Sequence, residues 1–131
     1  LMGFVLDIFG NLTKLTYLYL GDNQLSGHIP RELGYLVNMR KLDLRNNKLI
    51  GSIPATFGSL VNLTSLVLWD NQLFGRIPPE LGYLMNLEEL GLSNNKLVGS
   101  LPDMFGNLTK LALLHLDGNK FSRHVPQKLV P

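Results

Sequence analysis

Histidine and carboxylate side chains are the residues of this chain whose types could carry acid–base chemistry or hold a metal ion. The histidines are His28, His115 and His124, and Glu88 and Glu89 are neighbouring carboxylates. A metal site or a catalytic pair needs such side chains within a few ångströms of one another. The chain has no cysteine, which excludes thiolate sites and disulfides. What the remaining residues can do depends on the elements that position them.

A unit of 24 residues recurs along the 131-residue chain. This step relates the asparagines Asn23, Asn47, Asn71, Asn95 and Asn119, the leucines Leu20, Leu44, Leu68, Leu92 and Leu116, and the prolines Pro30, Pro54, Pro78, Pro102 and Pro126. Residues 1–14 form a partial N-terminal repeat, and residues 15–131 form five units. The last unit is atypical, because Arg123 stands where earlier units have glycine. A period of this length predicts a solenoid of stacked units.

Each unit predicts one short strand and one helical turn. Leucines at period 2, such as Leu66 and Leu68, indicate a half-buried strand, and the long return to the next strand requires a parallel sheet. The proline that follows can open a short helix. The repeated asparagine is predicted to satisfy backbone groups and to bridge neighbouring units. The glycines Gly34, Gly58, Gly82 and Gly106 are expected to end the helical turn in a left-handed cap.

This arrangement separates the reactive side chains. His28 and His124 occupy the same place in units four steps apart, so strand spacing keeps them at least about 19 Å apart. His115 projects from a strand on another face, and the side chains of Glu88 and Glu89 diverge. We therefore predict no catalytic site, cofactor or metal. The net charge of +2 and the lack of a long apolar run predict neither nucleic-acid binding nor membrane insertion.

The central unit carries a specific motif. It reads Leu60-x-x-Leu63-x-x-Leu66-x-Leu68-x-x-Asn71-x-Leu73-x-Gly75-x-Ile77-Pro78-x-x-Leu81-Gly82-x-Leu84. This pattern resembles the plant-type leucine-rich repeat (LRR) family. The resemblance implies an α/β repeat solenoid, a right-handed coil with a parallel β-sheet on its concave face and short 3-10 or helical turns on its convex side. It also implies a second, less regular sheet at the Gly-x-Ile-Pro segment. Family members include ectodomains of plant receptor kinases, receptor-like proteins and polygalacturonase inhibitors.

Function is expected at the variable positions of each strand, which point out from the sheet. The predicted ligand-binding residues are Tyr17, Tyr19, Lys41, Asp43, Arg45, Val67, Trp69, Asp70, Glu89 and His115. Aromatic residues of this kind are enriched in binding hot spots, and Arg45 is expected to stack on Trp69. Positive charge gathers in the second full unit and negative charge in the fourth. We predict a protein or peptide ligand; the alternative is that these exposed positions vary freely.

Two further features concern the surface. Ile50, Phe74 and Val98 share one place in the unit, where they either pack within the second sheet or form a lateral apolar patch. Asn11, Asn62 and Asn107 each begin an Asn-Leu-Thr glycosylation sequon, which predicts an extracellular location, secreted or as the ectodomain of a membrane protein. The alternatives are a structural module that self-associates through uncapped ends, and an inhibitor of a secreted polysaccharide-degrading enzyme.

Overall fold

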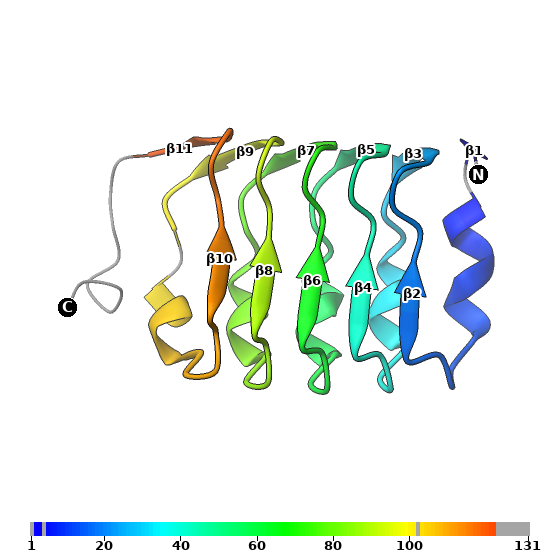
Figure 1. The fold of residues 1–131 in the computed structure, drawn as a ribbon, viewed down its shortest axis with the longest axis horizontal. Coiled ribbons are helices and arrows are strands. Elements are labelled where there is room, and N and C mark those ends of the chain that lie inside the picture. Colours follow the sequence, from blue (N-terminus) through cyan, green and yellow to red (C-terminus); the bar gives the residue numbers. More distant parts are fainter. Residues whose placement is uncertain (1, 4, 102, 123–131) are drawn as a thin grey trace.

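The structure, a computed structural model, describes residues 2–3, 5–101 and 103–122, so the sequence interpretations of Arg123 and His124 lie outside it. The chain coils as a stack of right-handed turns (Figure 1). A five-stranded sheet faces the viewer, a six-stranded sheet runs along the upper edge, and short helices lie behind. The predicted α/β repeat solenoid is confirmed.

The five-stranded sheet is the predicted concave sheet, and all its pairs are parallel. Its strands are β2 (Tyr17–Tyr19), β4 (Lys41–Asp43), β6 (Ser65–Val67), β8 (Glu89–Gly91) and β10 (Leu113–His115). Leu18 pairs with Leu42 and Leu42 with Leu66, so the register repeats the sequence period without a slip. The leucines of every strand therefore point to the same side of the sheet.

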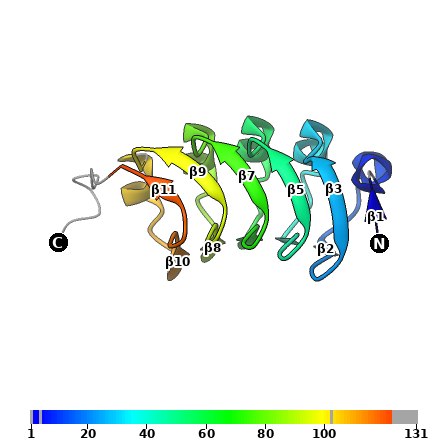
Figure 2. The ribbon, with the colours of Figure 1, turned by 90° about the horizontal axis from the view of Figure 1, so that it is seen from above.

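The six-stranded sheet is the predicted second sheet. Its strands are β1 (Met2–Gly3), β3 (Gln24–His28), β5 (Lys48–Gly51), β7 (Gln72–Gly75), β9 (Lys96–Gly99) and β11 (Lys120–Phe121). Figure 2 shows these strands crossing from the five-stranded sheet towards the helices. Gly27, Gly51, Gly75 and Gly99 have φ between 82° and 87°, a left-handed conformation that favours glycine.

Short 3-10 helices return the chain along the convex side. They are η1 (Val5–Asn11), η2 (Arg31–Tyr35), η3 (Ala55–Ser59), η4 (Pro79–Tyr83) and η5 (Asp103–Asn107). Pro30, Pro54 and Pro78 immediately precede η2, η3 and η4 with φ between −68° and −64°, as predicted.

The predicted left-handed glycine caps of these helices are wrong. The positive-φ residues do not include Gly34, Gly58, Gly82 or Gly106. Gly34 and Gly58 instead allow neighbouring helices to pack closely. A Cβ atom on Gly34 would collide with Thr56 of the next helix, and one on Gly58 would lie 2.7 Å from the Glu80 carbonyl oxygen.

The core lies between the two sheets and the helices. In the central units the inward leucines are fully buried, together with Met39, Phe57 and Phe105. Towards the ends, Leu15, Leu20, Leu114 and Leu116 are only partly buried. Stability therefore rests on contacts between neighbouring turns, as in other repeat proteins.

The asparagine ladder is confirmed in detail. Asn71 is buried, its amide donates to the carbonyl oxygens of Leu44 and Leu68, and its Oδ1 accepts from the N–H of Leu49. Asn47 and Asn95 make the same set of bonds one unit away on either side. Each asparagine thus joins the backbone of its own turn to that of the preceding turn.

Within the described ranges, none of the helices has the length and apolar character needed to cross a membrane. The same part of the chain contains no group of three or more histidine, aspartate or glutamate side chains that could hold a metal ion.

Candidate binding face of the five-stranded sheet

The register of the five-stranded sheet brings the predicted binding residues into two rows. One row runs through Tyr17, Lys41, Ser65, Glu89 and Leu113, and the other through Tyr19, Asp43, Val67, Gly91 and His115. Because the strands are consecutive and parallel, residues 24 apart in the sequence become direct neighbours about 4.8 Å apart. The predicted residues of these strands therefore share one face, while Arg45, Trp69 and Asp70 follow the strands β4 and β6.

Trp69 lies across the second row rather than standing out from it. Its indole ring occupies the space that a side chain on Gly91 would fill. The ring reaches His115 in an edge-on contact, with centroids 5.7 Å apart and planes at 89°. Because Gly91 has no side chain, the indole ring of the single tryptophan of the chain can pack over it.

Two expectations about these residues require correction. The sequence predicts that Val67 projects as a contact residue, but its exposed fraction in the middle strand of the sheet is only 4%. Arg45 was expected to stack on Trp69. Its side chain instead lies over Gly21, in the turn before its own, while Trp69 leans over Gly91 in the turn after its own.

The first strand presents two aromatic rings. Tyr17 and Tyr19 are 51% and 60% exposed, and their rings stack with centroids 6.2 Å apart and an interplanar angle of 11°. Two stacked, exposed tyrosines offer a large apolar area with hydroxyl groups at the rim.

The charge of Arg45 is shared between two carboxylates. Its guanidinium lies 3.9 Å from Asp22 and 3.8 Å from Asp43, and Asp43 also accepts a hydrogen bond from the backbone N–H of Arg45. The exposed Arg40 and Lys41 lie at the start of β4, in the same turn as Arg45, and extend the positive region. This part of the face is preorganised by ion pairs that are partly open to solvent.

The opposite end of the face is acidic. Ser65 donates a hydrogen bond of 3.1 Å to Glu89, and Ser93 donates one of 2.5 Å to Asp117. The bond from Ser93 is the main cause that lowers the pKa of the Asp117 carboxyl, and the charge of His115 adds a smaller contribution. Sequence reasoning did not single out Ser93 and Asp117, although they occupy the same place in adjacent units.

The backbone conformation at position 70 favours an aspartate or asparagine there. The φ of Asp70 is 57°, and Asp22, Asn46 and Asn94 at equivalent positions are also left-handed. Asparagine and aspartate tolerate this conformation better than most residues. The Asp70 carboxylate accepts a bond of 2.8 Å from Asn94. Its exposed side chain remains a proposed contact, but the turn alone accounts for its presence.

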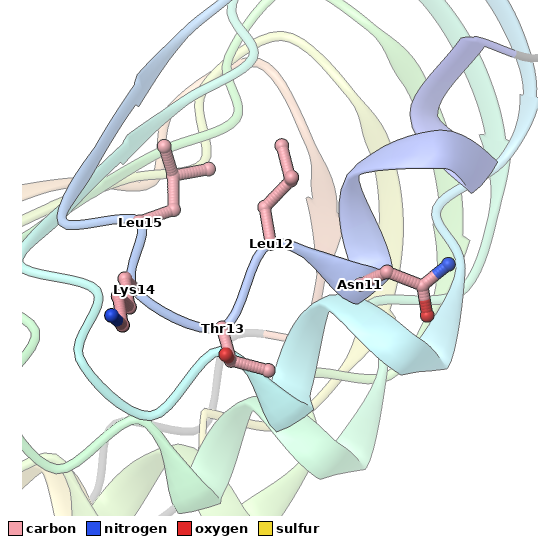
Figure 3. A pocket seen from close by; sticks show the side chains of 5 residues that line it. All are labelled: Asn11, Leu12, Thr13, Lys14 and Leu15. Atoms are coloured by element: carbon pink, nitrogen blue, oxygen red, sulfur yellow. The ribbon is translucent and has the colours of Figure 1, made fainter.

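The sequon asparagines Asn11, Asn62 and Asn107 are all exposed and lie outside the binding face. Asn11 and Asn107 end helices η1 and η5, whereas Asn62 donates a bond of 3.3 Å to the Val37 carbonyl oxygen. Figure 3 shows Asn11 at the end of η1, among the residues that line a shallow hollow together with Leu12 and Leu15.

The repeat pattern and the two sheets place the chain among known proteins. Residues 3–130 match the family described as a leucine-rich repeat region. The chain belongs to the leucine-rich repeat proteins. It resembles a TDR receptor with a TM-score of 0.95 and 37% identity, over 98% of this chain and 22% of that one.

Two other LRR relatives come from Arabidopsis. The receptor kinase HAESA, in complex with the peptide hormone IDA and the co-receptor SERK1, matches with a TM-score of 0.94 and 37% identity, over 98% of this chain and 22% of that one. A probable LRR receptor-like serine/threonine-protein kinase of Arabidopsis thaliana is 44% identical over 43 residues, which is 33% of this chain and 4% of the kinase. The chain therefore spans a small part of the length of these relatives.

Proposed function

We propose that this LRR chain is an extracellular recognition module that binds a peptide or protein segment across its five-stranded sheet. The observation that carries the proposal is the row of unlike side chains held in one register. It begins with the stacked tyrosines of β2, passes through basic residues at β4, and ends with acidic residues and His115 at β8 and β10.

The mechanism is recognition by a preformed surface. The backbone of this face is fixed by the sheet and by the buried asparagine ladder, so binding orders few main-chain groups. A rigid surface loses little conformational entropy on association, and a few aromatic and charged contacts can then dominate the affinity. HAESA, a receptor kinase with a closely similar fold, forms a complex with a peptide hormone, which supports a peptide or protein as the ligand class.

An affinity measurement with two matched variants tests this proposal. A random-peptide library is selected on the folded chain, and the affinities of the enriched peptides are measured by titration calorimetry. Tyr17→Ala should weaken binding by about 1–2 kcal/mol, because the exposed ring supplies contact area at low entropic cost. Tyr83→Ala removes a tyrosine from the convex side that is more exposed than Tyr17, and it should change the affinity little. Equal losses for the two variants would refute a ligand on the five-stranded sheet.

The self-association alternative is tested by the mass of the chain in solution. A module that docks end to end gains mass as its concentration rises, because binding of each copy follows mass action. Sedimentation at several concentrations therefore separates the two readings: a constant monomer mass supports recognition of a different molecule.

A further inference from the structure

The outward face of the six-stranded sheet carries an exposed apolar strip. Ile50 of β5, Phe74 of β7 and Val98 of β9 form this strip, and all three side chains are exposed. The sequence left open whether these residues pack within the sheet or form a patch; the structure shows the patch. Phe74, with 49% of its surface exposed, is the largest of the three.

Basic side chains lie directly beside the strip. The register pairs Phe74 with Lys96 and Val98 with Lys120 on the next strand, so these two apolar residues each have a lysine as a neighbour on the same face, whereas Ile50 pairs with Gln72. Arg76 lies against Gly99, because a Cβ atom there would be 3.0 Å from the Arg76 Cγ. Lys48 at the start of β5 is also exposed.

This face has no compensating carboxylate. Residues 24–29, 48–53, 72–77, 96–101 and 120–122 contain lysine, arginine and histidine but neither aspartate nor glutamate. No ion pair joins Lys48, Arg76, Lys96 or Lys120 to a carboxylate within the described part of the chain. On the five-stranded sheet, by contrast, the carboxylates outnumber the cations: Asp22, Asp43, Asp70, Glu88, Glu89 and Asp117 against Arg40, Lys41 and Arg45. The small net charge of +2 conceals this separation.

We infer that the face of the six-stranded sheet is a second docking surface, for a protein partner that presents acidic and apolar side chains next to each other. It is separate from the proposed ligand face and does not depend on it. The acidic character of the partner follows from electrostatic complementarity, because unpaired cations on one face favour a partner of opposite charge. The apolar character of the partner follows from the exposed side chains of Ile50, Phe74 and Val98. Burying these side chains is favourable only when the partner excludes water from them.

A polypeptide fits this pattern better than a uniform polyanion. The pairs Phe74–Lys96 and Val98–Lys120 call for a partner that places an apolar group and an anion as far apart as neighbouring side chains are. A uronic-acid polysaccharide or a nucleic-acid backbone supplies anions without aliphatic side chains. Cations spread singly over successive strands also give a weaker field than the basic cluster that an anionic membrane surface attracts.

Titration calorimetry with defined probes tests the inference. The first probe is a synthetic peptide in which glutamate alternates with leucine, and its control is the matched peptide in which lysine replaces glutamate. Sodium polygalacturonate and vesicles of phosphatidylserine serve as the other anions. The protein variants are Phe74→Ser and Lys96→Glu on the six-stranded sheet, with Tyr83→Ser on the convex side and Trp69→Ala on the five-stranded sheet as controls.

We expect the glutamate–leucine peptide to bind and the lysine–leucine peptide to fail. Phe74→Ser and Lys96→Glu should each weaken binding by about tenfold or more, and the effect of Lys96→Glu should shrink as added salt screens the charges. Tyr83→Ser and Trp69→Ala should leave the affinity unchanged.

The inference would be overturned by no binding of the glutamate–leucine peptide, by equal binding of the two peptides, by tighter binding of polygalacturonate or vesicles, or by an unchanged affinity in Phe74→Ser. Loss of binding in Trp69→Ala would also overturn it, and would move the peptide to the five-stranded sheet, where it would support the proposed function instead. Failure of one surface is thus distinguishable from failure of the other.

Discussion

Replacement of Asn71 by alanine removes the central member of the buried asparagine ladder. The side chain makes one bond that nothing replaces, from the N–H of Leu49 to Asn71 Oδ1 at 3.0 Å. Its amide also donates to the carbonyl oxygens of Leu44 and Leu68, which keep a second donor in Asn47 and Asn95. The substitution therefore leaves one fully unsatisfied buried N–H and weakens two carbonyl interactions.

These losses set the expected magnitude. A buried donor without a partner costs about 1–3 kcal/mol, and a lost hydrogen bond to a group that keeps another partner costs about 0.5–1 kcal/mol. We therefore expect Asn71→Ala to lower the free energy of unfolding by about 2–5 kcal/mol. Asn38→Ala is the matched control, because Asn38 donates a bond of 2.9 Å to Thr13 from an exposed site. Water can replace that bond, so the control should cost less than about 1 kcal/mol.

Urea unfolding followed by circular dichroism and by the fluorescence of Trp69 measures both variants. Agreement between the two probes checks that the stack unfolds as one cooperative unit, which the free-energy comparison requires. The reasoning would be refuted if Asn71→Ala and Asn38→Ala differed by less than about 0.5 kcal/mol, within the usual range of surface substitutions.

Three further predictions concern the binding face and the sequons. Gly91→Val should displace the indole of Trp69 from its position over residue 91 and shift the tryptophan emission to longer wavelength. An unchanged emission spectrum would contradict the described contact. Ser93→Ala should raise the pKa of Asp117 towards its ordinary value of 3.8, as NMR titration of the carboxyl would show. Because the pKa of Asp117 is lower in the folded state, the hydrogen bond from Ser93 stabilises the folded chain at pH values above the ordinary pKa. This stabilisation is lost as the pH falls through the folded-state pKa. A pKa of Asp117 that Ser93→Ala leaves unchanged would show that Ser93 does not cause the shift. Expression through a secretory pathway should add glycan mass at Asn11, Asn62 or Asn107, whereas a product that stays at 14.6 kDa would argue against use of the sequons.

Much of the fold could be predicted because every unit carries the same pattern of residues and is therefore subject to the same physical constraints. Leucine at period 2, a fixed asparagine and a proline in each unit specify a strand, a turn and a helix start. The sheet register follows directly, since the step from Leu42 to Leu66 in the sequence is also the pairing in the sheet. The buried role of Asn71 follows from the need to satisfy backbone groups where each strand ends.

What the sequence could not supply was the direction in which side chains lean. Arg45 and Trp69 stand at equivalent places in adjacent units, yet the glycines that receive them lie on opposite sides, at Gly21 and Gly91. The backbone of Gly34 could not be predicted either, since close approach to Thr56 and a left-handed cap both favour glycine. Such features depend on which neighbour occupies the adjacent turn, which the periodicity does not specify.

The central claim, that the five-stranded sheet is the surface on which this LRR module binds its ligand, is tested most directly by NMR. Backbone amide shifts would be recorded on the labelled chain with and without a peptide selected on it. The account predicts shifts along the two rows that start at Tyr17 and Tyr19 and end at Leu113 and His115. Shifts confined to the convex helices around Tyr35 and Tyr83 would contradict it.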